Sequence, residues 1–134
     1  MATIKTESLP LRSEQDIVRA RQAVRRLTQE VGFGLVDQTK VVTATSELAR
    51  NALVYGLGGT MVCDVLEEGI RKGLRLQFID QGPGIPDIDL AMTDGWTSGQ
   101  GMGLGLSGAR RLVSDFTLDT APGKGTTVTI TRWK

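Results

Sequence analysis

The pattern of apolar and polar residues predicts alternating groups of strands and helices along the chain. Residues 13–31 carry apolar side chains at steps of three and four, the spacing that places them on one face of an α-helix. Residues 36–55 show the same spacing. Residues 74–80 instead alternate between apolar and polar side chains, which is typical of a strand with one buried face. Four further runs are predicted to be strands: residues 2–11, 60–68, 116–121 and 126–133.

Polar caps and glycines predict where the helices begin and end. Ser13 is a suitable N-cap for the first helix, and Asp16 occupies the position that a capping box gives to Glu or Gln. Gly32 follows that helix and is expected to form its C-terminal cap. The second helix is expected to stop at Gly56. A third helix is predicted within residues 103–114, after a glycine-rich loop.

The order of these elements predicts an α+β fold. One strand is followed by two helices, two strands, a long loop, a helix and two final strands. Strands joined by short turns form antiparallel pairs, and the grouped helices need a sheet to cover. We therefore expect a two-layer α/β sandwich with a mixed, mostly antiparallel sheet covered on one face by three helices. With 134 residues and no repeat or linker, residues 1–134 are expected to form one domain.

Composition and charge exclude several classes of function. Apolar residues make up 40% and charged residues 23% of the chain, and the net charge is +1, so neither nucleic acid nor an anionic membrane is expected as a partner. No signal-length apolar segment is present, which predicts a cytoplasmic protein. The chain has no histidine, which excludes histidine-based acid–base catalysis and a phosphohistidine relay within it. Its one cysteine, Cys63, is interpreted as a small core residue.

Glu47 and Asn51 are an unusual polar pair beside the apolar stripe of the second predicted helix. They are four residues apart, so a helix places both side chains on one face. The carboxamide oxygen of Asn51 suits Mg²⁺, a hard cation that also binds substrate phosphates. The carboxylate of Glu47 is placed to take a proton from an attacking hydroxyl.

A glycine-rich turn follows the alternating strand, in the sequence Asp80-Gln-Gly-Pro-Gly84. The ionised carboxylate of Asp80 only accepts hydrogen bonds, and one natural partner is an exocyclic amine such as adenine N6. Gly82 and Gly84 lack Cβ atoms, so the backbone can lie close to a flat ring. The alternative interpretation is a simple turn that Asp80 caps.

A second glycine-rich segment, Gly101-Met-Gly-Leu-Gly-Leu106, precedes the third predicted helix. Free N–H groups and the helix dipole favour an anion at such a position, so the segment predicts phosphate binding. It comes too late in the chain for a dinucleotide-binding βαβ unit. The pair Gly123-Lys124 does not form a P-loop either, because a strand follows it.

Taken in order, these motifs resemble the N, G1 and G2 boxes of the GHKL (Bergerat-fold) ATPase and kinase superfamily. Across nearly the whole chain, the sequence resembles the RsbT type of small serine/threonine kinase within it. The segments that carry this resemblance are 16–21, 31–34, 46–51, 80–87 and 132–133.

The resemblance implies an ATP- and Mg²⁺-dependent protein kinase of a bacterial stress-response module. Such a kinase phosphorylates a STAS-domain antagonist, and once released it activates a PP2C-type phosphatase or another output protein. Residues 85–100 would form a short ATP lid. The implied roles are Glu47 as catalytic base, Asn51 as Mg²⁺ ligand, Asp80, Gly82 and Gly84 at adenine, Gly101, Met102, Gly103, Leu104, Gly105 and Leu106 at the phosphates, and Thr126 or Thr127 assisting Asp80 through a hydroxyl or water.

Two other interpretations stay open. In the first, nucleotide only stabilises a binding module that acts by sequestering or activating a partner such as a sigma factor. The basic face of the first helix, with Arg19, Arg25 and Arg26, would then matter more than Glu47. In the second, the domain has lost its activity, although every polar position of the site is filled.

Overall fold

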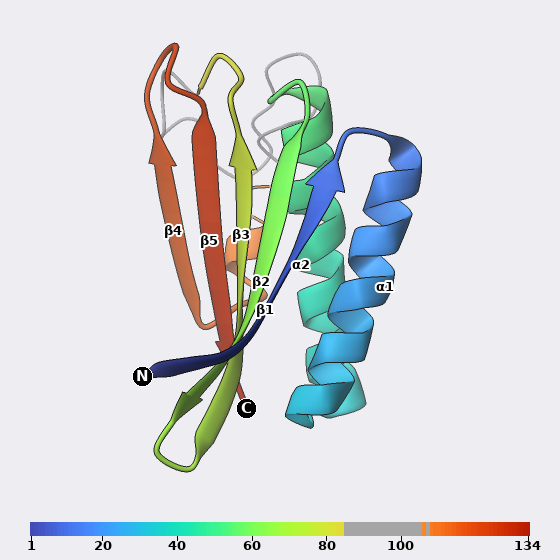
Figure 1. The fold of residues 1–134 in the computed structure, drawn as a ribbon, viewed down its shortest axis with the longest axis vertical. Coiled ribbons are helices and arrows are strands. Elements are labelled where there is room, and N and C mark those ends of the chain that lie inside the picture. The colour runs from blue at the N-terminus through green and yellow to red at the C-terminus, as the bar shows by residue number, and fades with distance from the viewer. Residues whose placement is uncertain (85–105, 107) are drawn as a thin grey trace.

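The chain folds into a sheet with helices on one side (Figure 1). The computed structural model describes residues 1–84, 106 and 108–134. Leu106 and residues 108–110 are helical and form part of a third, short helix. The other elements, in chain order, are β1 (Ala2–Leu11), α1 (Glu14–Val31), α2 (Leu35–Val54), β2 (Gly59–Glu68), β3 (Arg71–Asp80), β4 (Asp115–Thr120) and β5 (Thr126–Trp133).

The five strands form one sheet in the order β1-β2-β3-β5-β4. All four described pairings are antiparallel, so the predicted two-layer α+β fold is confirmed with an antiparallel sheet. The helices lie on one face of the sheet (Figure 1). The C-terminal ends of α2 and β3 and the β4–β5 turn meet at the same end of the molecule, shown at the top of Figure 1. Neither α1 nor α2 has the length and apolarity that a membrane-spanning helix needs.

Both ends of α1 form as the sequence predicts. The Ser13 hydroxyl accepts a hydrogen bond from the Asp16 N–H at 3.2 Å, and the Asp16 carboxylate accepts one from the Arg12 N–H at 2.9 Å. Gly32 ends the helix with φ +94°, the left-handed conformation that glycine adopts without strain. The Phe33 N–H donates to the Thr28 carbonyl at 3.0 Å, which completes a Schellman-type cap.

The core lies between the helices and the sheet. Val41, Ala44, Leu48 and Ala52 from α2 are buried there, as their spacing predicts. On the sheet side, β3 contributes alternate residues to the same core. These residues are Leu74, Leu76 and Phe78.

The third helix ends earlier than predicted. Residues 108–110 are helical, but residues 111–114 are turns and bends. The Ser114 N–H donates to the Thr131 carbonyl at 2.9 Å, and the Arg132 guanidinium donates to the Leu112 carbonyl at 3.1 Å. Because β5 takes these backbone groups, the helix does not extend to Ser114. The predicted C-terminal part of this helix is wrong for that reason.

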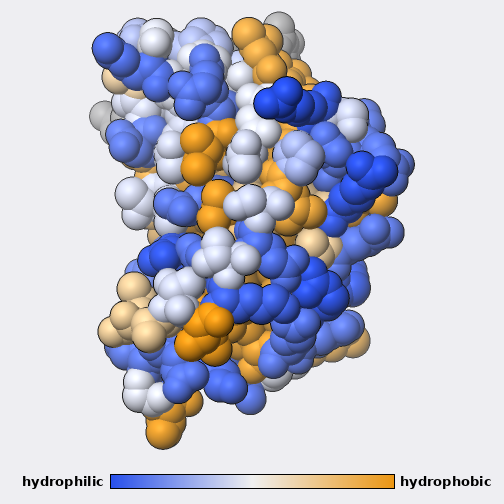
Figure 2. Space-filling model, viewed as in Figure 1, coloured by the Kyte–Doolittle hydropathy of each residue, from blue (hydrophilic) through white to orange (hydrophobic). Residues whose placement is uncertain are grey.

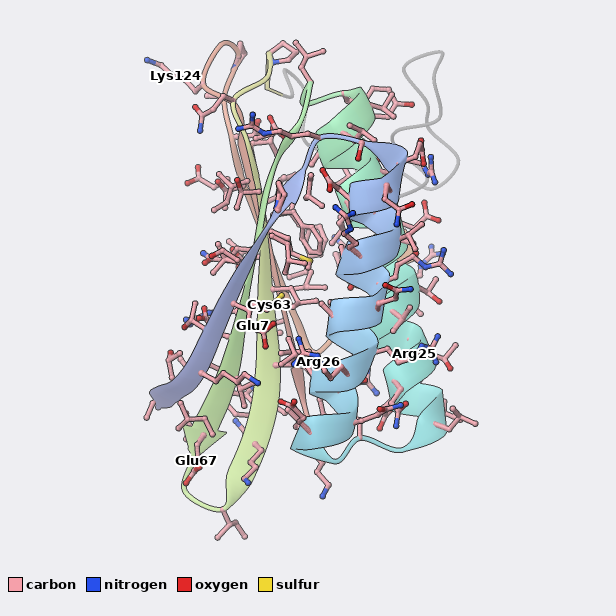
Figure 3. All side chains as sticks on the ribbon, turned by 45° about the vertical axis from the view of Figure 1, so that its right-hand side comes forward. Glu7, Arg25, Arg26, Cys63, Glu67 and Lys124 are labelled. Atoms are coloured by element: carbon pink, nitrogen blue, oxygen red, sulfur yellow. The ribbon has the colours of Figure 1, made fainter. Side chains whose placement is uncertain are left out.

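An ion-pair cluster fastens the edge strand β1 to α1. Figure 3 shows Arg26 on α1 facing Glu7 on β1. The Arg26 guanidinium donates two hydrogen bonds to the Glu7 carboxylate, at 2.6 and 3.1 Å. Lys5 lies 3.1 Å from Glu30, which also accepts from Arg26 at 3.3 Å. Cys63 lies in β2 directly beside Glu7, buried in the core as predicted, and burial raises the pKa of its thiol to about 12.

We expect Glu7→Gln to lower the free energy of unfolding by about 0.5–1 kcal/mol at neutral pH, the value of a partly exposed ion pair. Arg26 lowers the pKa of Glu7, so the pair stabilises the fold above the ordinary glutamate pKa of about 4.3. That contribution is lost as pH falls through the lowered folded-state pKa. Urea unfolding at several pH values measures it. Glu67→Gln, at an exposed glutamate for which the structure gives no ion pair, is the matched control. An equal effect of both variants would contradict the prediction.

The surface in Figure 2 is mostly hydrophilic, with small apolar patches between charged groups. Two of the most exposed apolar side chains lie at opposite ends of the molecule. Ile70 is at the β2–β3 turn, and Leu57 is 81% exposed in the loop between α2 and β2. Leu57 has φ +62° and is the one non-glycine residue of the described chain in this strained region. It stands directly after Gly56, next to the residues described below.

Candidate functional site

A row of polar residues crosses the sheet at the end where α2 and β3 terminate. Asp80 is the last residue of β3 and faces the helices, in line with the core residue Phe78. Thr126 is its direct cross-strand partner on β5. Thr120 on β4 is in turn the partner of Thr126. The antiparallel register therefore puts one carboxylate and two hydroxyls side by side on the helix-covered face.

The end of α2 packs against this row through Gly56. A Cβ atom at Gly56 would overlap the carboxyl group of Asp80. A Cβ at Gly82 would lie 2.7 Å from the Cα of Gly56, which is shorter than a packing contact allows. The Asp80 carboxylate accepts a hydrogen bond from the Gly82 N–H at 2.9 Å. The two glycines thus let the helix end and the turn after β3 close around Asp80.

The opposite side of this turn is held by the β4–β5 turn. The Gly123 N–H donates to the Pro83 carbonyl at 2.7 Å. Gly84 has φ +77°, and a Cβ there would overlap the Ala121 carbonyl. A larger residue at Gly84 would therefore be both strained and in steric conflict. As a result, residues 80–84 lie between the end of α2 and the β4–β5 turn.

Burial raises the pKa of Asp80, and backbone hydrogen bonds from Gly82 and Thr126 partly oppose this shift. The side chain is 8% exposed and has no cationic partner among the described ion pairs. A carboxylate held this way destabilises the free protein. Such a group is typical of a binding position, where a ligand supplies the missing hydrogen-bond donor.

Glu47 and Asn51 lie within α2, so the predicted helical pair is present. Glu47 is exposed, whereas Asn51 is partly buried. The Asn51 Nδ2 atom is buried, and the described residues offer it no hydrogen-bond acceptor. Buried polar atoms are normally hydrogen-bonded, so an unpaired one fits a side chain whose partner comes with a ligand. Asn51 is also five residues before Gly56, in the last turns of the helix whose end meets Asp80.

The second glycine-rich segment is described only at its last residue. Leu106 is helical, 1% exposed and part of the core. Leu106 therefore connects the end of this segment to the core. Gly101, Met102, Gly103, Leu104 and Gly105 lie outside the described residues, as does the predicted lid at residues 85–100.

Comparison with known proteins shows the family to which the chain belongs. Residues 36–134 match the family described as histidine kinase-, DNA gyrase B-, and HSP90-like ATPase. A serine/threonine-protein kinase named RsbT, from Bacillus subtilis (strain 168), is 44% identical over 121 residues, which are 90% of this chain and 91% of that protein. The chain belongs to the RsbT-type serine/threonine kinases.

Two more distant similarities also extend over most of the chain. An anti-sigma F factor of Bacillus licheniformis is 26% identical over 121 residues, covering 84% of this chain and 81% of that protein. The crystal structure of the RsbU and RsbW domains of Rv1364c from Mycobacterium tuberculosis superposes with a TM-score of 0.65 at 23% identity. It covers 96% of this chain and 32% of that one, and it supports the fold alone.

Two residues of this kinase's candidate site were not predicted from the sequence. Gly56 was interpreted only as the end of a helix, and Thr120 as one residue of a strand. Gly56 packs against Asp80, which is 24 residues later in the chain, and no local sequence pattern predicts that contact. Thr120 follows from the register of β4 with β5, six residues before Thr126. The two final strands were predicted to be joined by a short turn, and residues on either side of such a turn face each other. The position of Thr120 opposite Thr126 could therefore have been predicted from the sequence.

We expect Gly56→Ala to weaken nucleotide binding by at least about tenfold and to destabilise the protein by about 1–3 kcal/mol, as overpacking does. The added methyl group has to displace the Asp80 carboxyl group. Calorimetric titration with ATP and urea unfolding measure the two effects. Gly34→Ala is the matched control, because a Cβ there has no neighbour within 4 Å. At the N-cap of α2, where glycine is preferred to alanine, it is expected to cost about 0.5–1 kcal/mol of stability and to leave ATP affinity unchanged. Unchanged ATP affinity in Gly56→Ala would show that nucleotide does not depend on this packing.

Proposed function

We propose that this single-domain kinase transfers the γ-phosphate of ATP to a serine or threonine of a STAS-domain antagonist protein. The observation that carries the proposal is the meeting of the α2 end, with Asn51 and Gly56, and the β3 end, with Asp80. This meeting brings the buried acceptor Asp80 and the last turns of the helix that carries Asn51 to the same end of the molecule, which supports a role for Asp80 at the base and for Asn51 at the phosphates. The 44% identity to a serine/threonine-protein kinase over most of the chain supports the reaction type.

Asp80 is proposed to bind the adenine amino group, with Thr126 beside it. Gly82 and Gly84 would act indirectly, because they let the turn pack against Gly56 and the Ala121 carbonyl and so hold Asp80 in place for the base. The phosphates are then assigned to the segment Gly101–Leu106 at the start of the third helix, where free N–H groups and the helix dipole favour anions.

Asn51 is proposed to hold Mg²⁺ through its carboxamide oxygen. The unpaired Nδ2 atom fits this assignment, because it can donate to a phosphate oxygen or a water of the same ligand shell. Once bound, the ion neutralises phosphate charge, which is its ordinary contribution to phosphoryl transfer. Its binding is expected to depend on the nucleotide, since Mg²⁺ keeps several waters and relies on substrate phosphates.

Glu47 is proposed to be the general base. It is exposed, one helical turn before Asn51, so a substrate protein can approach it from solvent. As the substrate hydroxyl oxygen bonds to the γ-phosphorus, the bond from phosphorus to the β–γ bridging oxygen breaks and ADP leaves. The hydroxyl proton passes to the Glu47 carboxylate. Such proton transfer contributes about 10²–10⁴-fold to a rate.

The released kinase is proposed to bind and activate a PP2C-type phosphatase or another output protein. The similarity to an anti-sigma F factor favours a second candidate, a binding module that acts by sequestration. The structure offers less support for the basic face of α1 in that role. Arg26 pairs with Glu7, and Arg19 lies 3.6 Å from Asp16. Arg25 points away from the sheet (Figure 3).

Incubation with γ-labelled ATP, Mg²⁺ and a panel of STAS-domain proteins tests the proposal. We expect label on one STAS protein, as phosphoserine or phosphothreonine, and none when Mg²⁺ is chelated. A pull-down of the same panel with and without ATP separates the two candidates. Stable capture of a partner without transfer of label would favour the sequestering module and reject the kinase proposal.

A further inference from the structure

The hydroxyls of Thr120 and Thr126 form a short hydrogen-bonded chain beside Asp80. Their Oγ1 atoms are 2.9 Å apart. The Thr120 hydroxyl also lies 2.9 Å from the carbonyl oxygen of Gly125 and donates to it. Thr126 stands between Thr120 and Asp80 in the register of the sheet. The chain therefore connects a backbone carbonyl to the position directly next to the Asp80 carboxylate.

The directions of these hydrogen bonds follow from the chemistry of the groups. A carbonyl oxygen only accepts, so Thr120 gives its single hydroxyl hydrogen to Gly125. In the bond between the two hydroxyls, Thr126 must then be the donor. Its hydrogen is committed to Thr120, and only oxygen lone pairs remain for a ligand.

We infer that Thr120 is a positioning residue that holds the Thr126 hydroxyl as a hydrogen-bond acceptor, so that the base pocket selects a 6-amino purine over a 6-keto purine. The inference rests on the proposed nucleotide site and adds a specificity determinant to it. Asp80 as a carboxylate also presents only acceptors. Two neighbouring acceptors match a ligand edge, or a bridging water, that donates hydrogens. In a 6-keto purine, the oxygen that replaces the amino group would face these acceptors, and N1–H would be the one donor on that edge.

Thr120 matters because a threonine hydroxyl rotates when nothing holds it. An unrestrained Thr126 can turn its hydrogen toward the ligand and donate to a keto oxygen, directly or through water. With Thr120 in place, this rotation breaks the hydrogen bond to Thr120. The energy of one such hydrogen bond corresponds to about a 3- to 10-fold change in preference.

Calorimetric titrations of the full chain with ATP and with inosine triphosphate, both with Mg²⁺, test the inference. The wild-type protein is expected to bind ATP at least about tenfold more tightly, the effect of an unpaired acceptor in a pocket. Thr120→Val removes the hydroxyl and keeps the shape, and should reduce the ratio of the two Kd values by about 3- to 10-fold. Thr120→Ser keeps the hydroxyl and should retain the wild-type ratio.

Two results would overturn the inference while leaving the proposed function intact. One is equal affinity of the wild-type protein for both nucleotides. The other is a wild-type ratio in Thr120→Val with folding verified by circular dichroism. If the valine variant does not fold, Thr120→Ala removes the same hydroxyl without filling its space. The ratio of its Kd values for the two nucleotides then tests the inference in the same way. Absence of ATP binding by the wild-type protein is a different outcome, because it rejects the proposed nucleotide site itself.

Discussion

Glu47→Gln should lower phosphoryl transfer to the protein substrate by at least about 100-fold, with ATP affinity unchanged. The amide keeps the size and hydrogen-bonding reach of the side chain but does not take up a proton. Glu47 is exposed and no described hydrogen bond or ion pair holds it, so the fold should not change. Single-turnover transfer of labelled phosphate, together with calorimetric ATP binding, separates the two effects.

Controls for this prediction lie on the same chain. Glu67→Gln removes an equal charge at the opposite end of the molecule and should leave transfer unaffected (Figure 3). Glu47→Asp restores a carboxylate one methylene shorter, so it should recover part of the rate. If Glu47→Gln transfers phosphate as fast as the wild-type protein, Glu47 is not the base. If its ATP affinity falls instead, the side chain acts in binding.

Local patterns of the sequence predicted the helices and strands well, because capping, backbone conformation and side-chain alternation depend on neighbouring residues. The Ser13 cap, the left-handed Gly32 and the alternation of β3 each depend on residues within a few positions. The third helix shows where local reasoning fails. Its residues after Arg110 keep a helical pattern, yet their backbone groups bond to β5. A prediction made from each segment alone does not account for hydrogen bonds to β5 that compete with those of the helix.

The candidate site divides in the same way. Glu47 and Asn51 are a local pair, and a helix alone brings them together. Asp80 and Thr126 are separated by 46 positions, and only the β3–β5 register makes them neighbours. The resemblance suggested that they cooperate, but it gave no reason. Gly56 and Thr120 are missing from the prediction because their importance comes entirely from what the fold places against them.

These contacts also connect stability with function. Among the described residues, Asp80 is buried beside Gly56 without a counter-ion and the Asn51 amide has a buried atom without a partner. Both features are unfavourable in the nucleotide-free protein. A ligand that supplies a donor to one and an acceptor to the other would relieve both. This relief would contribute to nucleotide affinity, and bound nucleotide should stabilise the fold by mass action in proportion to the logarithm of its concentration over Kd.

Asp80→Asn should lower ATP affinity and, at the same time, raise the stability of the nucleotide-free protein. We expect ATP affinity to fall by about 10- to 100-fold, since a hydrogen bond to a charged group contributes about 1.5–3 kcal/mol. The nucleotide-free variant should nevertheless melt at a higher temperature than the wild-type protein at neutral pH. Asn does not carry the buried charge, and its oxygen can still accept from the Gly82 N–H. Differential scanning fluorimetry with and without ATP measures both effects.

The pH dependence gives this prediction a definite sign. Burial raises the pKa of Asp80, so the charge destabilises the fold above the raised value and is neutralised as pH falls through it. The stability advantage of Asp80→Asn should therefore shrink toward acidic pH, opposite to the effect of Glu7. Asp64→Asn is the control: Asp64 is equally buried but paired with Arg75 at 3.0 Å. Its loss should destabilise the protein and leave ATP binding intact. A lower melting temperature for both variants would show that the Asp80 carboxylate supports the fold, and the proposed trade between stability and binding would be wrong.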